Sequence, residues 1–180
     1  MTSQQASWDE AVSNRLLRWP GFNERGSLHL PMPWFSDAWP LPGTWEVDGR
    51  LLQRKHEFHL TVLSRREGAR VRERIPDGGV ERRFDEHAWT LGATGACWYL
   101  ASAAAGKWSI IATFECAALN AFRSAIASDA GITLEATLPH VTLYVGGVPT
   151  GIGLESIAEF EALLPRRVWL ERRGEPGGSG

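Results

Sequence analysis

Apolar and polar residues alternate in two short segments, one in each half of the chain. Residues 58–63 read FHLTVL and residues 139–143 read PHVTL. Alternate side chains of a β-strand share a face, so each His is displayed beside the Thr that stands two positions later. The aliphatic residues between them then pack on the opposite face. The pattern predicts two strands, each of which presents an imidazole and a hydroxyl in a His-x-Thr motif.

Periodic and turn-forming segments elsewhere predict an α+β order of elements. Apolar residues at helical spacing predict helices at 8–19, 116–130 and 154–164, and residues 64–74 and 82–91 are interpreted as shorter helices. Strand patterns occupy 45–47, 51–53, 97–102, 108–115 and 168–170, while the two His-x-Thr strands extend over 55–63 and 138–145. Asp48-Gly49 predicts a two-residue hairpin turn, and residues 76–79 predict another turn.

This order of elements is compatible with two related halves, each of which contributes one His-x-Thr strand. The length of 180 residues suits one domain with a full core, or two small lobes that share one. We therefore expect a single domain over residues 1–173 and a disordered tail over residues 174–180.

The segment 20–44 interrupts the pattern with prolines and large aromatic residues. Its prolines are interleaved with Trp34, Phe35 and Trp39. Proline removes a backbone donor, so we expect neither a central strand nor a helix interior here. We interpret the segment as a covering loop at the edge of the core, with a lid over a ligand site as the functional alternative.

The composition argues against several functional classes. Hydrophobic residues make up 43% of the chain and charged residues 22%, as in an ordinary globular protein. The formal charge of -2 argues against a protein that holds a long nucleic acid through many phosphates. No apolar run approaches a membrane span, and the N-terminus lacks a signal-peptide pattern. Cys97 and Cys116 are too few for a disulfide framework, and free thiols indicate a reducing compartment, so we expect a cytoplasmic protein.

Two imidazoles that face each other across a groove form an acid–base pair. A neutral His accepts a proton from water and a protonated His donates one to a leaving oxygen, because the imidazole pKa of about 6.5 lies near working pH. A neighbouring Thr hydroxyl can donate to phosphate oxygens on which charge accumulates. His59 with Thr61 and His140 with Thr142 therefore suit phosphodiester cleavage without a metal, and strained cyclic phosphates in particular.

The motifs His59-Leu60-Thr61-Val62-Leu63 and Pro139-His140-Val141-Thr142-Leu143 resemble those of the 2H phosphoesterase superfamily, which includes 2′–5′ RNA ligase-like proteins and cyclic nucleotide phosphodiesterases. The resemblance implies a bilobal α+β fold, with two related antiparallel-sheet halves, helices outside and a central groove. It also implies metal-independent hydrolysis of a cyclic phosphate or 2′–5′ phosphodiester in a nucleotide or short oligonucleotide. No cofactor and no obligate protein partner are expected, and RNA ligase activity is the reverse of one such cleavage.

Carried over by resemblance, the catalytic residues are His59, Thr61, His140 and Thr142, with the two His as acid and base and the two Thr orienting the phosphate. Strand parity adds two substrate-binding residues. Tyr144 shares the predicted face of His140, and Lys55 shares that of His59 if the strand extends so far. A structural role for Tyr144 and a solvated one for Lys55 are the alternatives.

Other interpretations of the site stay open. The same groove could bind a nucleotide or RNA end without cleaving it. His56 and His59 could together bind a metal ion. Their three-residue spacing argues against this, because a regular strand puts the two side chains on opposite faces. His29 and His87 lack strand context of this kind, and we assign no role to them.

Two further groups of residues have both a structural and a functional interpretation. The tryptophans that could stack on a base, or simply fill the core, are Trp34, Trp39, Trp89 and Trp98. The arginine-rich run over 65–74 is a solvated face or, alternatively, a surface that steers phosphates toward the preceding strand.

Overall fold

The computed structural model describes residues 15–92 and 94–170, in which two antiparallel sheets carry the strands. β4 (His59–Leu63) pairs with β1 (Leu28–Pro31) in a two-stranded sheet. The second sheet has six strands in the order β2-β3-β7-β6-β5-β8. Their bounds are β2 (Thr44–Val47), β3 (Arg50–Arg54), β5 (Thr94–Ser102), β6 (Lys107–Phe114), β7 (His140–Gly146) and β8 (Arg166–Val168). The predicted α+β class is confirmed, and the two His-x-Thr strands belong to different sheets.

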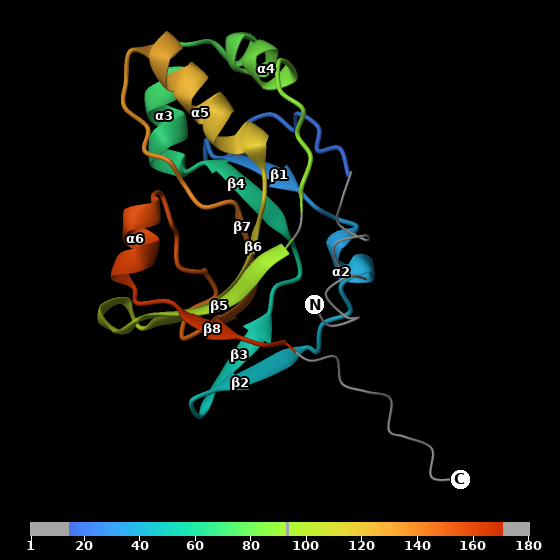
Figure 1. The fold of residues 1–180 in the computed structure, drawn as a ribbon. Coiled ribbons are helices and arrows are strands. Elements are labelled where there is room, and N and C mark those ends of the chain that lie inside the picture. The colour runs from blue at the N-terminus through green and yellow to red at the C-terminus, as the bar shows by residue number, and fades with distance from the viewer. Residues whose placement is uncertain (1–14, 93, 171–180) are drawn as a thin grey trace.

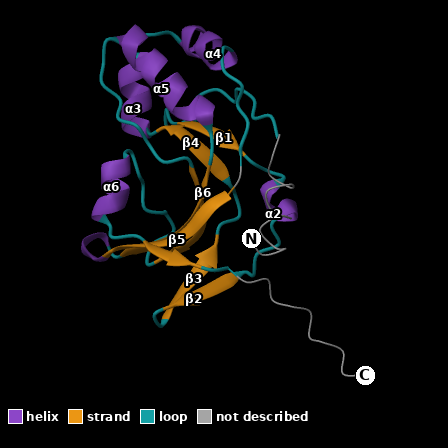
Figure 2. Ribbon diagram, viewed as in Figure 1, coloured by secondary structure: helices purple, strands orange, loops and turns teal. Residues whose placement is uncertain are grey.

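The helices gather mainly at one end of the molecule (Figure 1). α3 (Arg65–Arg72), α4 (Asp77–Asp85) and α5 (Ala117–Ala130) lie there, and both α3 and α5 contact β4. α6 (Ile157–Ala162) lies apart from this group, as does the short α2 (Phe35–Ala38) (Figure 2). A 3-10 turn, η1 (Ala103–Ala105), connects β5 to β6. None of the helices in the described ranges is long and apolar enough to cross a membrane.

Local sequence signals explain several element boundaries. Ser64 accepts from the Glu67 backbone N–H, and the Glu67 side chain accepts from the Ser64 N–H, which forms a capping box at the start of α3. Gly131 ends α5 with a φ of 62°, in the left-handed region that glycine favours. Asp48 and Gly49 both have positive φ, as a tight hairpin turn between β2 and β3 requires.

The six-stranded sheet separates a main core from a smaller cluster. The main core contains Ile110, Tyr144 and Leu60, together with the apolar faces of α4 and α5. The smaller cluster lies around Leu100 and Ile111, packed against Phe160 of α6. Adjacent strand residues thus face different clusters, and the His-x-Thr strands have their aliphatic residues in the main core.

Two predicted features of the first half are wrong, because tertiary pairing decides them. Residues 8–14 of the predicted first helix lie outside the described residues, and 15–19 are not helical: the Leu17 N–H donates to the Trp89 carbonyl at 2.8 Å. The segment 20–44 is not only a loop. It contains α2 and also β1, in which Leu28 and Leu30 are fully buried and Pro31 stands at the strand end.

Further boundaries differ from the sequence-based ones. The predicted turn at 76–79 is instead the start of α4, where Val80 and Phe84, one helical turn apart, are both buried. The helix predicted at 82–91 therefore ends at Asp85. The strand predicted over 55–63 is broken by a bend at 56–57, and the last strand is β8 at 166–168 rather than 168–170. The predicted tail over 174–180 lies outside the described residues.

Candidate active site

The two His-x-Thr motifs approach each other where β3 leaves its partner strand. β3 pairs with β7 at Gln53 and Arg54, and the Lys55 N–H then donates to the Leu143 carbonyl at 2.8 Å. Beyond Lys55 the chain bends away from β7 and joins β1 as β4. His59 consequently begins β4 near the end of β7 at which His140 stands. The two imidazoles are close enough for a charge on His140 to disfavour one on His59.

His59 is held in its neutral form at neutral pH. Burial is the largest cause, and it lowers the pKa of His59 to about 4 because a charged imidazole loses its hydration. Charges on His29, Lys55 and His140 act in the same direction. If the neutral imidazole accepts a proton here, burial and these neighbours make it retain that proton poorly.

His140 is fixed by its backbone neighbour. Its Nδ1 lies 2.8 Å from the Leu138 carbonyl oxygen, which can only accept, so Nδ1 carries the hydrogen. Nε2 is then the nitrogen available for proton exchange. Burial lowers the pKa of His140, whereas the bond to Leu138 raises it by favouring the imidazolium form.

A third histidine stacks directly on His59. The rings of His29 and His59 have centroids 4.2 Å apart and planes inclined by only 5°, and His29 is the cross-strand partner of Thr61. Burial lowers the pKa of His29 as well. His29, to which the sequence assigns no role, therefore belongs to the surroundings of His59. The alternation in Leu28-His29-Leu30 was the available signal, although the surrounding prolines obscured it.

The Thr residues keep their predicted faces. Thr61 is half-buried on the side of β4 that carries His59, while Leu60 and Val62 are fully buried behind it. Thr142 opposes Ile111, on the same face of β7 as His140. Gly151 packs against Thr142 so closely that a Cβ atom there would lie 3.2 Å from Thr142 Cγ2. The loop after β7 therefore folds back over this Thr.

Tyr144 does not share the face of Thr142, contrary to the prediction from strand parity. Thr142 opposes Ile111 and Tyr144 opposes the adjacent Ile110, so a bulge at Leu143 reverses the alternation. Tyr144 is fully buried in the main core, and its hydroxyl donates to the Pro42 carbonyl at 2.9 Å. A structural role is what its contacts support.

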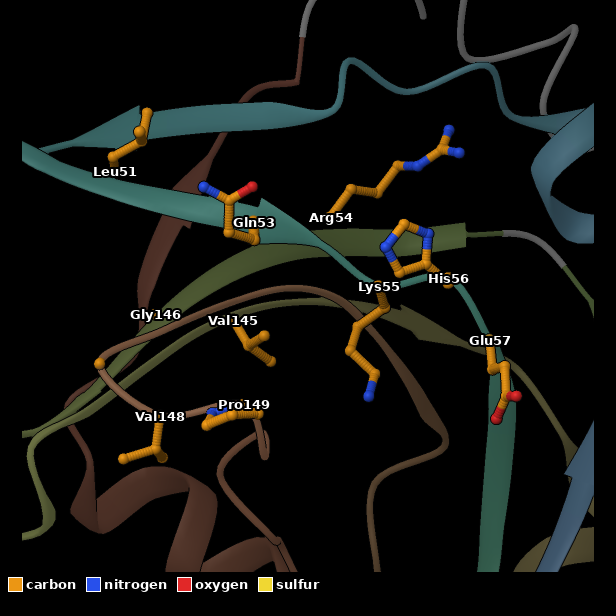
Figure 3. A pocket seen from close by; sticks show the side chains of 11 residues that line it. Leu51, Gln53, Arg54, Lys55, His56, Glu57, Val145, Gly146, Val148 and Pro149 are labelled. Carbon is orange, nitrogen blue, oxygen red and sulfur yellow. The ribbon is translucent and has the colours of Figure 1, made fainter.

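Lys55 lies on the same side of the sheet as the two motifs. Gln53 opposes Val145, and Val145 opposes Ser109, which shares a face with Ile111 and hence with Thr142. Lys55, two residues after Gln53, projects into the cavity beside this face (Figure 3). Its ammonium group is also close enough to His59 to lower the pKa of that imidazole.

The metal-site hypothesis finds no support in the described ranges, where no three His, Cys, Asp or Glu side chains are grouped to hold an ion. The His56 ring lies on the other side of the backbone from Lys55 (Figure 3). His87 packs edge-on against Phe122, 6.2 Å between ring centroids, and not against either motif.

The tryptophans and arginines considered from sequence mostly have internal partners. Trp89 stacks on Phe84 and donates to its carbonyl, and Trp98 packs edge-on against Phe160. The four tryptophans proposed for stacking do not border the cavity beside Lys55. In α3, Arg66 pairs with Glu155, and Arg72 pairs with Asp77.

No protein-family model matches this chain, and the comparisons with curated proteins and with solved structures likewise find no match.

Proposed function

We propose that this protein is a metal-independent phosphodiesterase that hydrolyses a cyclic phosphate or 2′–5′ phosphodiester of a nucleotide or short oligonucleotide. One observation carries the proposal: the two His-x-Thr strands come from different sheets and contact each other, and His140 and Lys55 are both close enough to His59 to lower its pKa. The 2H resemblance implies that the two motif strands line one groove. Free thiols at Cys97 and Cys116 support a reducing, cytoplasmic setting.

The surroundings of the two imidazoles suggest different roles. Burial and the neighbouring charges keep His59 unprotonated at neutral pH, which is the form that a general base toward water requires. His140 has a carbonyl partner on Nδ1 that stabilises the imidazolium. A bound phosphate anion raises the pKa of an imidazole, and His140 can then donate its Nε2 proton to the leaving oxygen.

The remaining polar groups fit the phosphate. Thr61 and Thr142 stand two residues after their histidines on the same faces, where their hydroxyls can donate to the non-bridging oxygens. The Lys55 ammonium supplies a positive charge that balances a phosphodiester anion. Proton transfer and charge stabilisation are thus both available from side chains of this chain.

A binding module is the second candidate function. The burial that lowers the pKa of both imidazoles reduces the protonated fraction needed for general-acid catalysis. The same groove would then hold a nucleotide or RNA end without cleaving it. The two candidates predict the same ligands but a different fate for the ligand.

A substrate screen separates the two functions. Purified protein is incubated with 2′,3′-cyclic nucleotides, 2′–5′ dinucleotides and cyclic dinucleotides, with and without EDTA, and products are resolved to show which oxygen keeps the phosphate. We expect hydrolysis of at least one class, at a rate that EDTA leaves unchanged. Ligand binding without turnover of any substrate would instead establish the binding module.

A further inference from the structure

A cavity of about 530 Å³ opens beside the candidate active site. One wall is formed by Leu51 and by the continuous segment 53–57, in which Gln53, Lys55 and Glu57 alternate with Arg54 and His56, and the other wall is formed by the end of β7 and the loop after it (Figure 3). Ligand pockets in proteins commonly enclose 300–1,000 Å³, so the volume suits a small molecule. Lys55 connects the cavity to the candidate active site, because it lines the cavity and also lies close enough to His59 to lower the pKa of that imidazole.

The side chains of the first wall change along the strand from apolar to polar to charged. Leu51 is apolar and 59% exposed, Gln53 carries an amide, and Lys55 carries a positive charge that acts on His59. At about 3.3 Å per residue, these three side chains span roughly 13 Å of strand. An apolar and amide-bearing end therefore lies farther from the histidines than the cationic end.

The second wall is apolar, and its position is set by a close contact between two backbone segments. Val145, Val148 and Pro149 face the cavity, and Val148 is an exposed hydrophobic side chain. Gly147 has a φ of 83°, and a Cβ atom there would lie 1.9 Å from the Gly106 carbonyl oxygen. Only glycine lets the loop pass this close to the β5–β6 turn, so the wall has a defined position relative to the sheet.

We propose that this cavity is the subsite for the nucleoside part of the substrate, an assignment that rests on the phosphoesterase or nucleotide-binding function proposed above. The base lies flat against Val145, Val148 and Pro149, and its polar edge faces the Gln53 amide. An amide suits this role because it both donates and accepts, as base edges do. Lys55 then contacts the phosphate, which is delivered toward His59 and His140.

Binding of a product nucleotide tests the subsite without requiring turnover. Adenosine 2′-monophosphate and inorganic phosphate are titrated into ¹⁵N-labelled protein, with the Gln53 side-chain amide followed by NMR. Val148→Trp fills the cavity, Gln53→Leu removes the amide, and Thr150→Trp is the matched control on an exposed loop position outside the lining.

The nucleotide should bind more tightly than phosphate and shift the Gln53 amide signals. Val148→Trp should weaken nucleotide binding by at least about tenfold, the loss of one base contact, and leave phosphate binding unchanged. Gln53→Leu should weaken nucleotide binding to a smaller degree, and the Thr150→Trp variant should bind both ligands as the wild type does. Equal affinity of nucleotide and phosphate, or wild-type nucleotide affinity in both Val148→Trp and Gln53→Leu, would overturn the assignment.

Failure here is distinct from failure of the proposed hydrolysis. If the protein binds the nucleotide at Gln53 but cleaves nothing in the substrate screen, the subsite stands and the hydrolase proposal falls. If the protein hydrolyses cyclic nucleotides with a kcat/KM that Val148→Trp does not change, the hydrolase stands and the subsite falls.

Discussion

At the scale of single residues, the environment of His59 determines what the site can do. The His29 ring of β1 stacks on it, and Lys55, which follows β3, and His140 of β7 both lower its pKa by their charges. All three can carry positive charge, and burial adds to their effect. The imidazole is therefore kept unprotonated at neutral pH, and the stacked His29 ring limits its orientation.

Replacing His29 by Phe should raise the pKa of His59 and keep the stacked ring in place. Phenylalanine removes the charge on the neighbour but not the burial, which is the larger cause, so the pKa should recover only in part toward 6.5. An NMR titration that follows a His59 ring proton measures this pKa directly. In an active enzyme the acid limb of the kcat/KM profile should move to higher pH by the same amount.

His87→Phe provides the matched control for this substitution, because His87 packs against Phe122 and touches neither motif. It should leave the His59 titration where it is in the wild type. An unchanged His59 titration in His29→Phe would show that the stacked ring has no electrostatic influence on the site.

At the scale of elements, Arg123 of α5 ties together the segments that hold β4 in position. It is 2% exposed, and its guanidinium donates to the Val62 carbonyl at 2.7 Å, to the Glu67 carboxylate at 2.6 and 3.1 Å, and to the Glu135 carbonyl at 2.8 Å. α5, α3, β4 and the segment leading to β7 meet at this one side chain. The relative position of the two motifs depends on it.

Arg123→Met should destabilise the fold strongly, because it leaves the Glu67 charge buried without a partner. Breaking a buried pair in this way removes roughly 3–5 kcal/mol of unfolding free energy, which urea denaturation can measure. The companion change Glu67→Leu in the same chain should restore part of the loss. Arg83→Met, which breaks the exposed pairs with Asp129 and Glu86, should lower stability far less, and equal losses at the two sites would show that Arg123 does not hold the elements together.

Local patterns predict the elements here better than they predict how the elements meet. The hairpin at Asp48-Gly49, the end of α5 at Gly131 and the strands of both motifs follow from a few adjacent residues each. The pairing of His29 with Thr61 joins segments that are distant along the chain. The bulge at Leu143 that removes Tyr144 from the site likewise depends on pairing with β6, and no local pattern reveals it.

At the scale of the whole molecule, the buried histidines link stability to pH. An unfolded imidazole is protonated below about 6.5, whereas the folded protein keeps His59 neutral down to about 4. The unfolded chain therefore binds more protons between these two values. Unfolding free energy has its full value above pH 6.5 and falls as pH decreases through this window, with His29 and His140 acting in the same direction.

His59 alone should account for roughly 3 kcal/mol of this loss between pH 7.5 and pH 4. Denaturation of wild type and of His59→Gln at both pH values isolates its share, because the carboxylates of the two proteins titrate alike. The wild type should lose clearly more stability on acidification than the variant. If both proteins lose the same amount, His59 titrates as an exposed imidazole does.

The most direct test of the central claim is the kcat/KM for adenosine 2′,3′-cyclic phosphate in the wild type, His59→Ala and His140→Ala, each measured with EDTA present. We expect the wild type to hydrolyse this substrate at a rate that EDTA does not affect. Each substitution should reduce kcat/KM by at least about 100-fold, as expected for a lost acid or base, while His87→Ala retains activity. Wild-type turnover in either His59→Ala or His140→Ala, or loss of wild-type turnover on adding EDTA, would contradict the central claim.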